Sequence, residues 1–197
     1  MAGTRHAMIS LMLLMERRDI GAAALARMRR DGVLTPLTDD AGVAPNAVPQ
    51  HIARALALAA WIPRRAAATG LAALWVYGLT RDTLAPAHVE VVVPRGAHPD
   101  PPVGVPYGRW AFTTHQAAYA RAHFVAGVRI AAPADAVASA LRTADLADAM
   151  ATAYCAVTSG FTSLEELSAA VSQRKSVVGS TRALNAWQAV QGALAGR

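Results

Sequence analysis

The chain has 197 residues, of which 54% are hydrophobic and 16% are charged, a balance that supplies a sizeable core and excludes global disorder. The formal net charge of +6 at pH 7 favours an anionic partner. The single cysteine, Cys155, excludes a disulfide framework and indicates a reducing compartment, so we expect a cytoplasmic protein. Because no apolar run is long enough to span a bilayer, we expect no membrane association.

The first part of the chain predicts two helices and a short strand. Residues 6–18 form the first helix, with four apolar side chains on one stripe at helical spacing: Met8, Leu11, Met12 and Met15. Residues 20–30 form the second, which is expected to bury Ala24, Leu25 and Met28 and to expose Arg27, Arg29 and Arg30. Asp31-Gly32 ends this helix as a C-terminal cap, and residues 33–37 form the strand.

A helix, an Asp-Gly turn and a strand follow one another in the order in which a recognition helix leads into the wing of a winged-helix domain. Only two helices fit into the first 32 residues, where a complete winged-helix domain has three. We therefore interpret residues 1–48 as a shortened winged-helix-like region. Residues 49–197 then form a second unit, a small mixed sheet packed with helices and followed by a helical C-terminus. The predicted fold class is α+β.

The second unit opens with a helix over residues 50–60, which is expected to bury Ile52, Leu56 and Ala59. Residues 66–68 predict a strand, residues 70–77 a helix, and the apolar residues 88–93 a central strand. An irregular, proline-rich loop is expected over residues 95–104. Two further strands are predicted over residues 107–114 and 122–130, the latter broken at Gly127.

From residue 134 onward the pattern is helical. Helices are predicted over residues 134–143 and 145–157, with Thr143 as an N-cap between them. Thr162 and Ser163 precede a helix that has Glu165 and Glu166 in its first turn, an arrangement close to a capping box. The last helix is predicted over residues 180–194.

The polar residues predict no catalytic group, no metal site and no cofactor. None of the six histidines has a metal-ligand spacing, and no serine-hydrolase motif is present. A nucleotidyltransferase is the enzymatic alternative, because such enzymes place a glycine-led helix before a strand with two carboxylates. Here Gly70 leads the helix, but the strand begins His88-Val89-Glu90 and offers a single carboxylate. A degenerate relative of that class therefore stays an alternative.

Four segments of the chain belong together as a pattern: ARMRRDGVL (residues 26–34), AALWVYGL (72–79), VEVVV (89–93) and GVRIAAP (127–133). This pattern resembles the AbiEi-family antitoxins of bacterial toxin–antitoxin systems. In that family the first segment joins the last winged-helix helix to the wing. The second is a small-residue helix that ends in Gly-Leu, the third is a strand, and the fourth leads through a proline into a helix. Tyr77 stands where the family has histidine.

The resemblance implies a non-enzymatic antitoxin and transcriptional regulator that binds operator DNA and has a cognate toxin. Five arginines are the expected phosphate contacts: Arg17, Arg18, Arg27, Arg29 and Arg30. An alternative is a protein-interaction module without DNA binding. Its stripe of Met8, Leu11, Met12 and Met15 would then dock on a partner protein or on a second copy of the chain.

Overall fold

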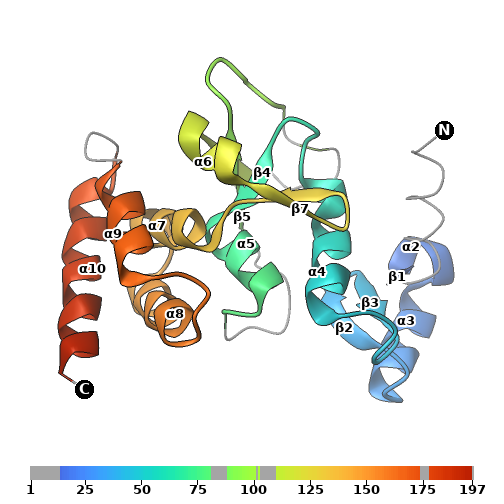
Figure 1. Ribbon diagram of the computed structural model, residues 1–197. Helices are drawn as coiled ribbons and strands as arrows, with labels where there is room; N and C mark the ends of the chain where they lie inside the picture. The colour runs from blue at the N-terminus through green and yellow to red at the C-terminus, as the bar shows by residue number, and fades with distance from the viewer. Residues whose placement is uncertain (1–13, 81–87, 101, 103–109, 174–177, 197) are drawn as a thin grey trace.

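A computed structural model describes residues 14–80, 88–100, 102, 110–173 and 178–196 (Figure 1). It contains helices, a three-stranded sheet and a five-stranded sheet, which confirms the predicted α+β class. The three-stranded sheet lies at one end of the molecule and the C-terminal helices lie at the other, with the five-stranded sheet between them. Within the described ranges, no helix is both long and apolar enough to cross a bilayer.

The N-terminal region is built from β1 (Leu14–Glu16), α2 (Arg17–Ile20), α3 (Ala22–Arg30), β2 (Thr35–Thr38) and β3 (Ala41–Val43). The strands are antiparallel in the order β1-β3-β2. The predicted helix over residues 6–18 is wrong for residues 14–16, because they pair with Ala41–Val43 and this distant pairing overrides the helical spacing. Three members of the predicted stripe, Met8, Leu11 and Met12, lie outside the described residues.

Helix α3 agrees in position with the predicted second helix but differs in what it buries. Leu25 is buried, as expected, whereas Met28 is only half-buried and Ala24 is exposed. The helix contacts the sheet along a narrow stripe, so the alanine lies beyond the covered face. Asp31-Gly32 ends the helix as predicted, with Gly32 at a φ of +71° and its N–H bonded to the carbonyl of Arg29.

Helix α4 (Gln50–Leu58) continues into a 3₁₀ turn, η1 (Ala59–Trp61), and connects the two sheets. The predicted buried face is wrong: Ala59 is exposed and Ile52 and Leu56 are half-buried. The buried residues are instead Ala53, Arg54, Ala55, Ala57 and Leu58. The physical reason is that α4 packs against the N-terminal sheet and against the next helix, α5, at once, so more than one of its faces is covered.

The five-stranded sheet has the order β6-β5-β4-β8-β7. Its strands are β4 (Ala67–Thr69), β5 (Val89–Val93), β6 (Trp110–Thr114), β7 (His123–Val125) and β8 (Val128–Ile130). Strand β5 runs antiparallel to β4 and parallel to β6, which confirms its predicted place inside the sheet. The predicted break at Gly127 is also confirmed, since β7 and β8 form an antiparallel hairpin around it.

Helix α5 (Gly70–Tyr77) follows β4 directly, and its bounds are those predicted. The C-terminal helices are α7 (Pro133–Thr143), α8 (Leu146–Thr158), α9 (Leu164–Ser172) and α10 (Ser180–Ala195). Thr143 ends α7, and the side chain that caps α8 is Asp145, so the predicted cap is wrong. The six-residue helix α6 (Gln116–Arg121) was not expected; the Nδ1 atom of His115 caps it by accepting the N–H of Ala118.

Candidate nucleic-acid interface

Helix α3 presents two of the predicted contact residues, Arg27 and Arg30, on its last turn. Both side chains are exposed, and both lie 3.5 Å from the carboxylate of Asp31. Ion pairs this exposed contribute little to stability and are screened by salt. Both guanidinium groups therefore stay available to an anion that approaches the end of α3.

Helix α2 carries the two other exposed arginines, and each has an acidic neighbour. Arg17 lies 3.3 Å from Asp40, which is in the turn between β2 and β3. Arg18 lies 2.5 Å from Glu16. All of the predicted contact residues come from two short, consecutive helices on one side of the molecule.

Arg29 differs from the other four arginines, because it is half-buried rather than exposed as predicted. Its Nη2 atom donates to the carbonyls of Thr38 at 2.5 Å and Ala41 at 3.0 Å, and its Nη1 atom donates to that of Asp39 at 3.1 Å. The guanidinium thus ties α3 to the β2–β3 turn. Helical spacing in the sequence could not show that Arg29 is half-buried while Arg30 is exposed, because the three carbonyls that bind Arg29 belong to a different part of the chain.

The charge of this region is balanced. Residues 14–48 contain five arginines and five carboxylates, so their formal net charge is zero. Helix α3 also exposes four small side chains: Ala22, Ala23, Ala24 and Ala26. A nucleic acid bound here would contact a helix surface of small side chains. The arginines near this surface are in exposed ion pairs, in which phosphates could replace the carboxylates, and the region as a whole is not strongly basic.

The interaction-module alternative depends on a stripe of four residues, of which the structure describes one. Met15 lies on the edge strand β1 and is 36% exposed. Beside this strand is a hollow of about 720 Å³, lined by Leu14, Arg17, Arg18 and Trp61 among others. Docking through the stripe stays a prediction.

The residues of the nucleotidyltransferase alternative do come together in space. Gly70 begins α5, and Glu90 lies on β5 opposite Thr69. A Cβ atom at position 70 would lie 2.6 Å from Oε2 of Glu90, so the carboxylate reaches the start of the helix. Ser139 of α7 donates to the same oxygen at 3.4 Å and accepts from Nη2 of Arg142 at 3.2 Å.

The pocket beside Glu90 has a volume of about 240 Å³, and its wall on β6 is formed by Ala111, Phe112 and Thr113. Glu90 is the one carboxylate among its described lining residues. A two-metal reaction needs at least one more carboxylate to hold the ions. In the ranges that the structure describes, no three side chains of histidine, cysteine, aspartate or glutamate are grouped as a metal site.

Tyr77, at the end of α5, joins that helix to the β7–β8 hairpin. Its hydroxyl donates to the carbonyl of Ala131 at 2.7 Å and lies 3.1 Å from Nε2 of His123. Since the single phenolic proton is used toward Ala131, the imidazole nitrogen is the donor in the second contact. Burial raises the pKa of Tyr77, which keeps the phenol protonated.

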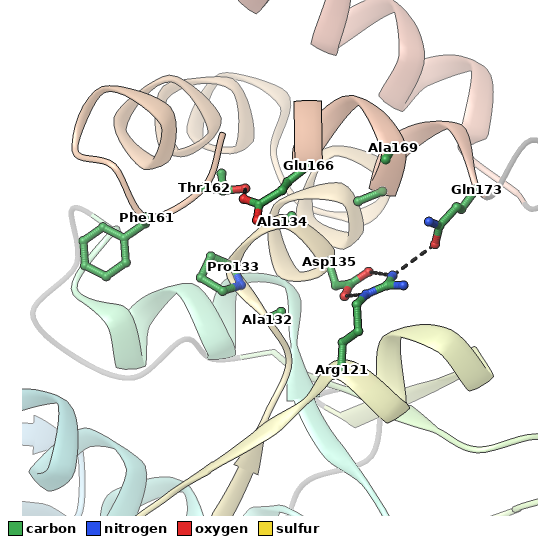
Figure 2. Close-up of a pocket in the computed structure, with 11 residues that line it drawn as sticks. Arg121, Ala132, Pro133, Ala134, Asp135, Phe161, Thr162, Glu166, Ala169 and Gln173 are labelled. Atoms are coloured by element: carbon green, nitrogen blue, oxygen red, sulfur yellow. Dashed lines mark hydrogen bonds and ion pairs between the residues drawn. The ribbon is translucent and has the colours of Figure 1, made fainter. Parts of the chain in front are cut away.

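A second pocket, which the sequence did not indicate, lies between the start of α7 and the face of α9 (Figure 2). One end holds Arg121, which binds both carboxylate oxygens of Asp135 at 2.6 and 2.9 Å and also contacts Gln173. At the other end lies Phe161, with Glu166 between the two ends. The pocket joins three separate segments of the chain, so no local spacing in the sequence could reveal it.

The predicted capping box at the start of α9 is confirmed. The Ser163 hydroxyl accepts the N–H of Glu166 at 3.0 Å, and Oε2 of Glu166 accepts the N–H of Ser163 at 2.9 Å. The Thr162 hydroxyl donates to the same carboxylate oxygen at 3.0 Å. These hydrogen bonds lower the pKa of Glu166 below its ordinary value.

A pH-dependent stability difference between the wild type and Glu166→Gln is therefore expected. Because the folded-state pKa is lowered, the ionised carboxylate stabilises the fold above the unfolded-state pKa, and this contribution disappears as the pH falls through the folded-state value. Chemical denaturation should show a wild-type advantage at pH 7 that is absent in strong acid. Glu165→Gln, which removes a carboxylate that accepts none of these hydrogen bonds, is the control; an equal pH profile for the two variants would contradict the assignment.

The chain matches no known family model and no curated protein sequence.

Proposed function

We propose that this protein is a DNA-binding, antitoxin-type regulator that contacts duplex DNA through α2 and α3 without catalysing a reaction. The observation that carries the proposal is the order of elements, β1-α2-α3-β2-β3, together with the sheet order β1-β3-β2. From its first strand onward, a winged helix-turn-helix domain has the same order. In that arrangement the second helix of the pair enters the major groove.

The contacts follow from this placement. Helix α3 is the recognition helix, and its exposed alanines, Ala22 to Ala26, permit a close approach to the groove. Arg27 and Arg30 on α3 and Arg17 and Arg18 on α2 bind phosphates. Arg29 holds the β2–β3 turn instead. Because phosphates carry no sequence information and alanines form no hydrogen bonds with bases, affinity is modest and specificity is low.

Salt dependence of binding tests this proposal. With four phosphate contacts, the logarithm of the association constant should fall with the logarithm of salt concentration with a slope of about −4. Replacing both Arg27 and Arg30 by glutamine should reduce the magnitude of that slope by about 2. Fluorescence anisotropy of a labelled duplex at 20 to 200 mM salt measures both slopes, a salt range of about one decade that suits the counterion-release analysis.

The control is the double variant Arg64→Gln/Arg65→Gln, which removes two exposed arginines outside α2 and α3 and should keep the wild-type slope. Absence of binding at the lowest salt concentration would overturn the proposal. An unchanged slope in the Arg27/Arg30 variant would show that DNA binds elsewhere on the chain.

The regulatory part of the proposal comes from the family resemblance. It adds a cognate toxin protein as partner and a cytoplasmic site of action. Co-purification with the product of the neighbouring gene tests the partner. A nucleotidyltransferase-type toxin recovered in a stable complex supports an antitoxin, while recovery of each protein alone argues for a regulator without that partner.

A further inference from the structure

The groove between α7 and α9 has an apolar floor of small residues. It has a volume of about 270 Å³, and the floor is formed by Ala132, Pro133, Ala134, Ala169 and Ala170. Figure 2 shows Phe161 at one end of the groove and the Arg121–Asp135–Gln173 contacts at the other, with Glu166 between them. Small apolar side chains of this kind leave room for an aliphatic stem to lie along the floor.

The two acidic groups of the groove are in different electrostatic situations. Asp135 is 8% exposed, and its charge is matched by the bidentate contact with Arg121. Glu166 is exposed and has hydrogen-bond donors, Thr162 and Ser163, but no cation paired with it among the described residues. Since those donors favour its ionised form, the centre of the groove carries one uncompensated negative charge.

One end of the groove is aromatic. Phe161 is 44% exposed, and its ring packs on one side against Tyr77, at a centroid distance of 6.1 Å. An exposed aromatic face attracts a cation, and arginine and lysine combine a cationic end with an aliphatic stem that covers apolar surface. The floor thus matches the aliphatic stem of such a side chain, and the carboxylate and the ring match its cationic end.

We propose that this groove binds an arginine or lysine side chain of a partner protein. The stem lies along the alanine floor, and the cationic end contacts the carboxylate of Glu166 on the side toward the ring of Phe161. Charge complementarity selects this occupant, because the groove offers an unmatched carboxylate and no unmatched cation among its described lining residues. The site is separate from α2 and α3, so it does not depend on DNA binding.

A peptide titration of the full-length protein tests the proposal. The probes are the capped tripeptides Gly-Arg-Gly and Gly-citrulline-Gly, which differ in charge but hardly in shape. Followed by ¹H–¹⁵N NMR, the arginine peptide should shift amides around residues 132–135 and 161–173. Its association constant should exceed that of the citrulline peptide by about fivefold, the upper range for an exposed ion pair.

Three variants assign the effect to the groove. Glu166→Gln keeps the capping box, because glutamine is also accepted at that position, and should abolish the preference for arginine over citrulline. Phe161→Leu should weaken arginine binding about two- to fivefold. Glu165→Gln, which removes a neighbouring carboxylate that does not line the groove, should bind as the wild type does.

Equal affinity for the two peptides would overturn the proposal, as would equal losses in Glu165→Gln and Glu166→Gln, which would indicate diffuse attraction. Spermidine serves as a free cation without a peptide backbone. If it binds as tightly as the arginine peptide and shifts the same amides, the groove takes small cations, and the assignment to a partner protein fails.

Discussion

Replacement of Arg54 by methionine is expected to lower the free energy of unfolding by about 2–3 kcal/mol, mainly through the lost charged hydrogen bond and ring contact. Arg54 lies on α4 and is 6% exposed. Its Nη1 atom donates to the carbonyl of Trp75 at 2.6 Å, near the C-terminus of α5, and its guanidinium lies 5.2 Å from the centre of the Trp75 ring. Burial lowers the pKa of Arg54, but arginine stays charged at neutral pH.

Urea denaturation of the wild type and of Arg54→Met measures this difference. Methionine preserves most of the apolar stem, so the loss of stability measures the contribution of the guanidinium group rather than the cost of a cavity. Arg64→Met, at an exposed position, is the control and should stay within about 0.5 kcal/mol of the wild type. An Arg54→Met protein as stable as the wild type would mean that the cost of desolvating the cation offsets its contacts.

Gly179→Ala is expected to destabilise the protein by about 2–4 kcal/mol, the sum of backbone strain and steric overlap. Gly179 precedes α10 with a φ of +80°, and an added Cβ atom would lie 2.9 Å from the backbone oxygen of Arg142. That oxygen also accepts from Nη1 of Arg182 at 2.9 Å, so it is held in place where α10 meets the end of α7. Backbone atoms cannot move aside as the tip of a side chain can.

The matched control is Gly160→Ala. Gly160 has a φ of +73°, but an added Cβ atom there meets no atom within 4 Å. This variant should therefore lose only the conformational part, about 1 kcal/mol. Thermal or chemical unfolding of both variants separates the two costs. Equal losses of stability in the two variants would show that the steric contact with Arg142 does not contribute to the destabilisation.

Several features were predictable because their signals lie within a few neighbouring residues. The bounds of α5 follow from Gly70 and Gly78, and the capping box of α9 follows from the spacing of Ser163 and Glu166. The buried strand β5 follows from its run of valines. In each case the chemistry that starts, ends or buries the element is contained in the element and its caps.

Other features depend on partners that are distant in the sequence. Residues 14–16 form a strand because β3 lies beside them, and Arg29 is withdrawn from solvent because the β2–β3 turn supplies three carbonyls. The groove at Glu166 exists because α7 and α9 pack together. Local patterns specify which residues are helical, capped or apolar. Pairing, burial of a charge and the shape of a site are set by contacts that form only when the whole chain is folded.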